Sequence, residues 1–327
     1  MLFHVKESFE KTLARASWLS QDSKHQALKK LYNMAANYLA PRWIEQPAEL
    51  DRRYTKKQLN IEDNSSLLKM VTKLTEFKAE QYKALLKERF DRLLFPSPIL
   101  FGESPLSINA VYLPPSNGLI IYLGIVDRPY FDARLPIWYN YGAMGLVVAH
   151  EVMHAFDTVG VKFDYKGRAS KQSGQLKSWL DARSNAAFRN LTDCLRKQYD
   201  AFCFGYNGTR YCQNGTTTLG ENIADTAGLQ TMYAAFKQHD KLIGQHEDLP
   251  IPLSKYSKDQ LFFMAVARPW CANNPKFDME NMVVRDDVHS VPRNRITGAM
   301  QNMPQFQAAF HCKSGSKMVP KKRCKVW

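Results

Sequence analysis

The chain has 327 residues, of which 45% are hydrophobic, with a formal net charge of +14 and a pI near 9.4. This length can bury a substantial core, and the sequence shows neither a signal peptide nor a run of about 20 apolar residues. The Lys and Arg residues are dispersed and accompany no nucleic-acid-binding motif, so we expect no nucleic-acid partner.

The first hundred residues have the spacing of helices. Residues 7–39 and 65–94 carry charged side chains interleaved with apolar ones and predict two long amphipathic helices. Pro41 and Pro47 mark a turn region between them. This part predicts a helical segment, residues 1–100, separate from the rest of the chain.

Residues 101–327 predict a second domain of mixed structure. Strands are expected at 110–112 and 119–125, on either side of a turn at 114–118, and helices at 144–156, 175–202, 219–238 and 258–266. Together the elements predict an α+β fold that is mainly α-helical.

The most informative stretch is His-Glu-x-x-His at residues 150–154, inside an apolar, helix-compatible segment. Residues four apart share one face of a helix, so His150 and His154 can reach one metal ion, with Glu151 beside its open coordination position. The alternative is a surface helix with two stray histidines. The apolar neighbours argue against it, because a buried histidine needs a polar partner.

A catalytic zinc requires a third protein ligand. The extended motif with a further histidine fails, because Gly160 occupies that position. Glu221 in a separate helical segment is the better candidate, and Asp225 lies four residues later on the same helix face. Histidine ligands usually donate their second ring N–H to a carboxylate, and we expect Asp225 to accept it from His150.

With these motifs the chain resembles the catalytic half of the neprilysin and endothelin-converting-enzyme family of zinc metallopeptidases, whose catalytic domain is a thermolysin-like zincin. The resemblance runs through nearly the whole chain in order and spacing. The matching segments are residues 108–112, 140–142, 150–157, 219–229, 260–263, 270–271, 287–290, 310–312 and 324–327.

The resemblance implies one Zn²⁺ per chain, bound by His150, His154 and Glu221. Glu151 would be the general base and later the proton donor, and Asp225 would orient a zinc histidine. His289 resembles the histidine that stabilises the tetrahedral oxyanion, with Asp287 as its orienting carboxylate.

The resemblance also implies a peptide-binding surface. Arg295 would bind a substrate carbonyl, and Asn109 with Ala110 would hold the substrate main chain as an added strand. An apolar pocket would take the side chain after the scissile bond and so favour cleavage on the amino side of large hydrophobic residues. Its lining residues are Ile125, Tyr130, Leu146, Val147 and Trp270.

Two functions remain open at this point. The first is a zinc-dependent endopeptidase or oligopeptidase acting on peptides. The second is a catalytically silent secreted fragment or paralogue that keeps the zinc site for stability or partner binding, because family ectodomains are about twice as long. We expect a fragment of an extracellular protein, either secreted or the ectodomain of a type II membrane protein, with a membrane anchor only if an N-terminal half exists. Residues 1–100 would then belong to the lobe that covers the substrate.

The six cysteines fit an oxidising compartment. The resemblance pairs Cys194 with Cys324, whereas Cys271 and Cys312 match cysteines whose partners lie in the absent half, to which they could form disulfides. Cys203 and Cys212 flank a short segment and predict a local bridge. Asn-x-Ser/Thr triplets, typical of secreted glycoproteins, occur at Asn64, Asn190, Asn207 and Asn214.

The chain departs from the family pattern near the site. Thr158 replaces an acidic residue after Asp157, Thr226-Ala227-Gly228 replaces Asn-Gly-Gly, and Asn294 replaces the aromatic residue before Arg295, in a loop altered at 291–293. No ligand or base is lost. We expect these changes to affect loop conformation and substrate preference.

Overall fold

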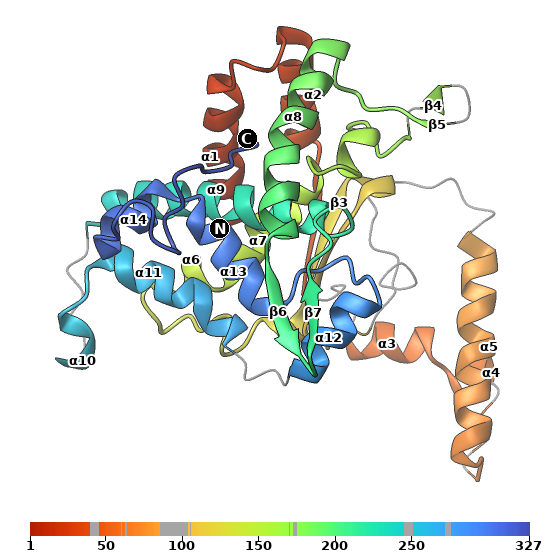
Figure 1. The fold of residues 1–327 in the computed structure, drawn as a ribbon. Coiled ribbons are helices and arrows are strands. Elements are labelled where there is room, and N and C mark those ends of the chain that lie inside the picture. Colours follow the sequence, from red (N-terminus) through yellow and green to blue (C-terminus); the bar gives the residue numbers. More distant parts are fainter. Residues whose placement is uncertain are drawn as a thin grey trace.

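The computed structural model describes residues 1–39, 46–59, 61–62, 64–85, 104, 106–169, 171–172, 175–244, 251–271 and 276–327 (Figure 1). Helices dominate these residues, as the sequence predicts. The helices of the first half are α1 (Leu2–Arg15), α2 (Gln21–Tyr32), α3 (Pro47–Arg53), α4 (Lys56–Leu59), α5 (Leu67–Leu85), α6 (Ile137–Gly142) and α7 (Met144–His154). Those of the second half are α8 (Ala182–Asp200), α9 (Leu219–Ile243), α10 (Ile251–Ser254), α11 (Lys258–Ala267), α12 (Lys276–Val284), α13 (Pro292–Gln301) and α14 (Pro304–Phe310).

Short strands complete the α+β fold. A three-stranded sheet has the order β1 (Ala35–Leu39), β3 (Gly118–Tyr122), β2 (Ala110–Leu113), and two hairpins are formed by β4 (Lys171–Gln172) with β5 (Gln175–Leu176) and by β6 (Cys203–Tyr206) with β7 (Thr209–Cys212). In the sheet, β1 runs parallel to β3, and β2 runs antiparallel to it, with Ala110 opposite Ile121. β2 is therefore an edge strand, and one side of its backbone is open to another chain.

The centre of the molecule is the packing of α7 against α9. Both helices are buried along most of their length, and their apolar side chains belong to one hydrophobic core. The two backbones approach closely at Gly228, where an added Cβ would lie 3.1 Å from the backbone nitrogen of His150. Glycine thus allows α9 to lie directly against the helix that carries both histidines.

The first predicted helix, residues 7–39, is wrong as a single element. The chain forms α1, turns, and starts α2 at Ser20, whose side chain accepts a hydrogen bond from the backbone N–H of Ser23. It then leaves the helical conformation and forms β1. Pairing between β1 and a strand some 80 residues later is a long-range contact, which helical periodicity does not reveal.

Other boundaries shift for local reasons. The helix expected from residue 175 begins at α8, because Asp181 caps it by accepting from the N–H of Ser184. α9 extends past residue 238 and ends at Gly244, which adopts the left-handed conformation. The strand expected at 119–125 ends at Tyr122, where a 3₁₀ turn follows. The predicted helix 65–94 is observed as α5, and residues 86–94 lie outside the described ones.

The division of the chain near residue 100 stays a prediction. α1, α2 and β1 pack into the same structure as the zinc-motif helix, since Val5, Phe9 and Leu13 of α1 belong to its hydrophobic core. α5 instead stands away from this body in Figure 1, with Leu67, Leu68 and Val71 exposed.

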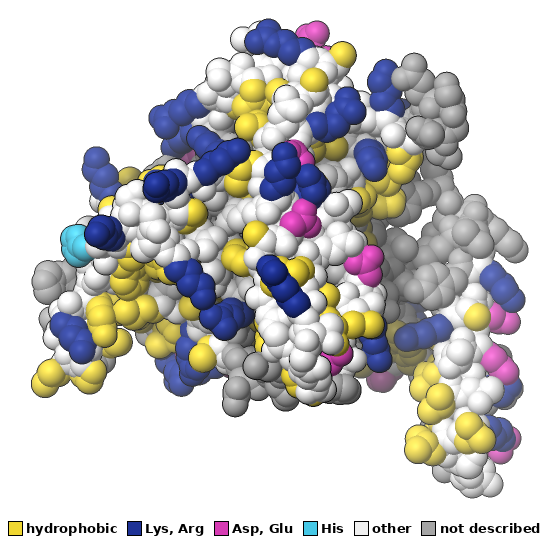
Figure 2. All heavy atoms as spheres, in the orientation of Figure 1, with side chains coloured by type: hydrophobic (Ala, Val, Ile, Leu, Met, Phe, Trp, Pro, Cys, Tyr) yellow, Lys and Arg dark blue, Asp and Glu magenta, His cyan; other side chains and the backbone are white. Residues whose placement is uncertain are grey.

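The surface carries the charge expected from the composition. Figure 2 shows Lys and Arg side chains scattered over the visible face rather than gathered in one groove, with few acidic side chains among them. Among the described helices, none is long and apolar enough to cross a membrane.

Candidate active site

Two neighbouring helices bring the three predicted zinc ligands together. His150 and His154 lie on α7, and both contact Glu221 in the first turn of α9. The two histidine Nε2 atoms are 2.9 Å apart, and they lie 3.2 Å and 3.4 Å from the carboxylate oxygens of Glu221. Bonds of about 2.0–2.2 Å to a tetrahedral zinc would separate two ligand atoms by roughly 3.3 Å. The three side chains therefore already have the spacing that a zinc ion requires.

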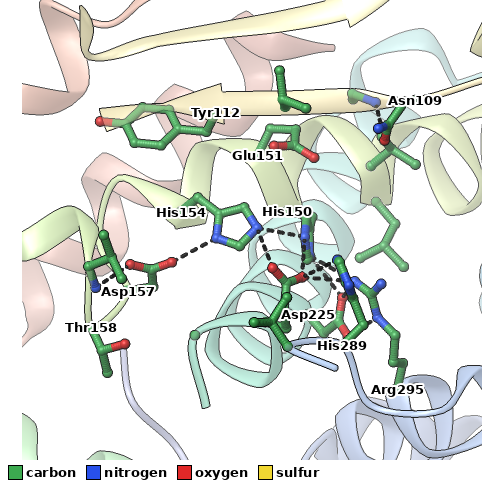
Figure 3. Close-up of a pocket in the computed structure, with 18 of the residues that line it drawn as sticks. Asn109, Tyr112, His150, Glu151, His154, Asp157, Thr158, Asp225, His289 and Arg295 are labelled. Carbon is green, nitrogen blue, oxygen red and sulfur yellow. Dashed lines mark hydrogen bonds and ion pairs between the residues drawn. The ribbon is translucent and has the colours of Figure 1, made fainter. Parts of the chain in front are cut away.

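Each histidine has a carboxylate behind it (Figure 3). His150 Nδ1 lies 2.8 Å from Asp225 Oδ1, and His154 Nδ1 lies 2.7 Å from Asp157 Oδ2. A proton on each Nδ1 is shared with a carboxylate, which leaves the Nε2 lone pairs directed at the metal position. The structure thus places Asp225 against His150 as expected, and the donor set fits zinc.

Asp157 is the orienting residue that the sequence analysis did not assign. Its second oxygen, Oδ1, accepts hydrogen bonds from the backbone N–H groups of Val159 and Gly160 at 2.7 Å and 2.6 Å. Asp157 therefore closes the end of the zinc helix and orients His154 at once. The position three residues after His154, on the same side of the helix end, was the available signal.

Glu151 is buried beside the ligands with only 5% of its surface exposed. In Figure 3 its carboxylate lies between α7 and the strand β2 that carries Tyr112, and Glu151 lines the same cavity as both histidines. Burial raises the pKa of Glu151, although the neighbouring histidines oppose this shift. A carboxylate in this position is suited to accept a proton close to the metal.

Glu221 has the opposite electrostatic setting. Burial alone would raise its pKa, but the hydrogen bond from His150 and the charges of His150, His154 and His289 lower it to about 2. Glu221 is therefore an anion at neutral pH, as a ligand of a divalent cation must be.

Arg295 is buried in the site and is held by contacts with Asp225 and Trp270. Its Nε and Nη2 atoms donate to the two oxygens of Asp225 at 2.7 Å and 2.8 Å, a bidentate pair, and Nη2 also lies 3.5 Å from Glu221. The guanidinium lies 4.3 Å from the centre of the Trp270 ring, a cation–π contact. Trp270 thus contacts Arg295 in addition to lining the cavity.

His289 approaches from the loop between α12 and α13. Its Nε2 lies 3.4 Å from Glu221 Oε2, and its Nδ1 lies 3.1 Å from Asp287 Oδ1. The same Asp287 oxygen accepts the backbone N–H of His289 at 2.8 Å. The structure therefore places Asp287 where the sequence analysis expects an orienting carboxylate.

A cavity of about 570 Å³ opens over these side chains. This volume is in the range of small-molecule and peptide-side-chain pockets. All the substrate-binding candidates line it, together with residues that the sequence analysis did not select. The predicted members are Asn109, Ala110, Ile125, Tyr130, Leu146, Val147, Trp270 and Arg295, and the additional ones include Thr158, Val159, Thr216, Thr217 and Val288.

Two disulfides are present in the described part of the chain. Cys194 of α8 is bonded to Cys324 near the C-terminal end, and Cys203 is bonded to Cys212 across the β6–β7 hairpin. Both pairings confirm the sequence analysis. Cys271 and Cys312 are in no disulfide in the described part of the chain.

Fold and site together are those of a zinc metallopeptidase of mainly helical architecture. The sequence model of peptidase family M13 matches residues 109–326. The chain belongs to peptidase family M13, the family that includes neprilysins and endothelin-converting enzymes, and the predicted resemblance is confirmed.

Curated relatives match along the entire chain. Neprilysin-3 of Drosophila melanogaster is 32% identical over 329 residues, which is 100% of this chain and 39% of the relative, and an endothelin-converting enzyme homolog of Locusta migratoria is 31% identical, with 42% of it covered. The chain therefore spans about two fifths of the length of these relatives.

Solved structures support the fold. A Haemonchus galactose-containing glycoprotein complex matches with a TM-score of 0.80 at 30% identity, and 100% of this chain covers 48% of that one. The zinc metalloprotease Zmp1 of Mycobacterium tuberculosis matches with a TM-score of 0.79 at 22% identity, with 46% of that chain covered.

Proposed function

We propose that this chain carries the active site of a zinc-dependent endopeptidase or oligopeptidase. The observation that carries the proposal is the placement of Glu151, which is buried next to three side chains already spaced for zinc. A site kept only for stability needs the three ligands and gains nothing from a buried carboxylate at the open coordination side. The intact base therefore favours the peptidase over the catalytically silent alternative.

The proposed roles follow from the geometry. Zinc, when bound to His150, His154 and Glu221, polarises the scissile carbonyl and lowers the pKa of water to about 7. Glu151 accepts the proton of the attacking water and passes it to the leaving amine. Burial raises the pKa of Glu151, which makes its carboxylate a stronger acceptor for the proton of the attacking water.

His289 and Arg295 would stabilise the negative charge that develops on the carbonyl oxygen. Both side chains line the cavity and lie within 3.5 Å of Glu221, so they reach the same region as the scissile bond. Asp287 and Asp225 hold them in place. Donors fixed in this way before the reaction stabilise a transition state without a cost of reorganisation.

Peptide substrates would bind along the edge strand β2. Asn109 and Ala110 lie at the start of this strand beside the cavity, where a peptide backbone can pair with them. The apolar wall formed by Ile125, Leu146 and Val147 favours a large hydrophobic side chain after the scissile bond. We therefore propose cleavage on the amino side of such residues.

The two disulfides support an extracellular or otherwise oxidising location. We propose that the protein acts there, secreted or as an ectodomain, on peptide substrates. We also propose that Cys271 and Cys312 can form disulfides with another segment of the protein in this location.

The proposal is tested by zinc stoichiometry measured together with peptide cleavage. The substrate is a peptide with one internal Phe or Leu, and the products are identified by mass spectrometry. Glu151→Gln should retain one zinc per chain and lose at least about 10²-fold in kcat, because it removes the base but no ligand. Glu76 is an exposed carboxylate that is paired with Lys73 in the described part of the chain, and Glu76→Gln is the matched control that should behave as wild type. Zinc binding without any Glu151-dependent cleavage would contradict the proposal.

A further inference from the structure

The hairpin formed by β6 and β7 is a small, closed unit next to the site. The disulfide between Cys203 and Cys212 joins its open end, and Asn207 and Gly208 form its tip with positive φ angles of 48° and 75°. Such a turn matches the twist of a two-stranded hairpin. The stacked rings of Phe204 and Tyr211 link the strands on one face. A two-stranded hairpin alone is marginally stable, so the disulfide fixes this one.

The hairpin and the residues after it contact the segment that carries His289. Tyr211 donates a hydrogen bond to Glu280 of α12 at 2.5 Å, and Asn214 donates to Asp286 at 3.1 Å. Figure 1 shows α12 directly beside the tip of the hairpin. Hence both α12 and the turn that follows it are tied to the hairpin.

Gln213 makes the most constrained of these contacts. Its side chain is 4% exposed, and its Oε1 accepts the backbone N–H of Val291 at 3.0 Å. Its own backbone N–H donates to Phe202, so it is fixed to the base of the hairpin. Val291 is the N-cap residue of α13, two positions after His289 and four before Arg295. The Gln213 side chain thus connects the hairpin to the backbone between His289 and Arg295, the two proposed oxyanion-stabilising residues.

The His289 side chain is 46% exposed. Its polar contacts with described residues are those with Asp287 in its own loop and with Glu221 at 3.4 Å. The buried bond from Ser290 to Asn222 of α9, at 2.8 Å, adds an anchor on the side facing the zinc helices. The loop is therefore held at Ser290 by α9 and at Asp286 and Val291 by the residues that follow the hairpin.

We propose that the disulfide-closed hairpin, acting through Gln213, Asn214 and Tyr211, positions the loop that carries His289 and so sets the rate of the chemical step. Gln213 is a positioning residue, since it touches neither the metal ligands nor the substrate-binding edge. The proposal rests on the proposed peptidase function for its kinetic consequence, whereas its structural consequence can be measured without any cleavage.

The kinetic test uses Gln213→Leu, which keeps the size of the side chain and removes the acceptor for Val291. We expect kcat to fall about 10-fold with KM changed less than twofold and zinc stoichiometry unchanged, because misplacing a transition-state donor lowers kcat without affecting uniform binding. The same substitution in a His289→Ala background should have less than a twofold further effect, because Gln213 acts through His289. Equal effects in both backgrounds would overturn the proposal.

The structural test is hydrogen–deuterium exchange on zinc-loaded protein. The double variant Cys203→Ser/Cys212→Ser and the single variant Tyr211→Phe should speed exchange across residues 285–294 and leave residues 144–154 unchanged. Tyr206→Phe removes a hydroxyl from the other strand of the same hairpin, for which the described residues provide no hydrogen bond, and should leave both regions unchanged. Unaltered exchange at 285–294 in the first two variants would overturn the positioning role even if wild type cleaves. Absent cleavage with faster exchange would overturn the peptidase proposal and support the positioning role.

Discussion

The helices α7 and α9 and the loop that carries His289 hold their functional side chains in place to different degrees. His150 and Glu151 are almost fully buried on α7, and Asp225, which is equally buried, orients His150 from α9. His289, by contrast, is 46% exposed in a loop and depends on contacts made by neighbouring elements. The difference predicts that metal binding and the proposed transition-state stabilisation can be separated by mutation. Changes in the helices should remove the metal, whereas changes around the loop should slow the reaction with the metal still bound.

The largest effect is expected from Glu221→Gln. A neutral amide replaces the carboxylate, whose Oε2 lies 3.2 Å from His150 Nε2 and whose Oε1 lies 3.4 Å from His154 Nε2, so zinc would be left with two protein ligands. We expect zinc stoichiometry to fall from one to near zero after dialysis, with no measurable cleavage. Atomic emission measures the metal. Retained stoichiometric zinc would show that Glu221 is not the third ligand.

Asp225 and Asp157 orient one histidine each, but only Asp225 also neutralises a buried arginine. Asp225→Asn should weaken zinc affinity by about 10–100-fold. It should also destabilise the fold by about 3–5 kcal/mol, because the buried guanidinium of Arg295 would lose its bidentate carboxylate and keep only the longer, 3.5 Å contact with Glu221. The metal affinity follows from competition with a chelator and the stability from urea unfolding.

Asp157→Asn is the matched comparison for that prediction. It should weaken zinc affinity to a similar extent, because the amide no longer takes up the proton of His154 Nδ1 as a carboxylate does. Its cost in stability should be clearly smaller, since Asp157 forms no salt bridge with a buried lysine or arginine among the described residues, and the nearby Lys30 donates its hydrogen bonds to backbone carbonyls. Equal destabilisation by both variants would show that the bond between Arg295 and Asp225 contributes little to the fold.

A smaller effect is expected in the loop. Asp287→Asn keeps an acceptor for the backbone N–H of His289 but removes the charge next to its imidazole. We expect kcat to fall about 3–10-fold, zinc stoichiometry to stay at one, and unfolding to be unchanged within about 0.5 kcal/mol. Steady-state kinetics with the internal-Phe peptide measures the rate. Loss of zinc in this variant would contradict the separation of loop and helices.

Local spacing was sufficient to select the three side chains that the structure brings together as a possible metal site. His150 and His154 lie four residues apart in one helix, and Glu221 and Asp225 repeat this spacing in another, so each pair has one geometry that sequence can reveal. The bidentate bond between Arg295 and Asp225 joins residues 70 positions apart and has no local signal. The contact of Asp157 with His154 spans only three residues, yet the sequence analysis gives Asp157 no role and names only the following Thr158 as a departure.

In the fold, too, elements set by local sequence were predicted, whereas an element set by long-range pairing was not. Apolar periodicity identified α7, α9 and α11, whose faces are buried along their length. It failed at residues 7–39, where the cap at Ser20 interrupts the helix and the parallel pairing of β1 with β3 overrides helical propensity. Long-range strand pairing is decided by tertiary packing, so no pattern within those residues indicates it.

Lys30 contacts the turn that follows the helix carrying the two histidines, and it offers a test of what stabilises this turn. It is buried on α2 with 1% of its surface exposed, and its Nζ donates to the carbonyl oxygens of Gly160, at 2.6 Å, and Phe163. These carbonyls belong to the turn that follows Asp157. Burial lowers the pKa of Lys30 to about 7, although Asp157 and Asp164 oppose the shift.

The pH dependence of stability follows from this shift with a definite sign. The folded pKa near 7 lies below the ordinary value of 10.5, so unfolding takes up a proton between these two pH values. The free energy of unfolding should therefore rise with pH across this range, by at most about 1.4 kcal/mol per pH unit from this group. Lys30→Met keeps the apolar stem and should remove that slope. Urea unfolding of both proteins at pH 7, 8 and 9 isolates the difference, and a difference that does not grow with pH would show that Lys30 stays protonated in the fold. In that case a buried ammonium group stabilises the turn at residues 160–163, and the region next to His154 depends on charge as much as on packing.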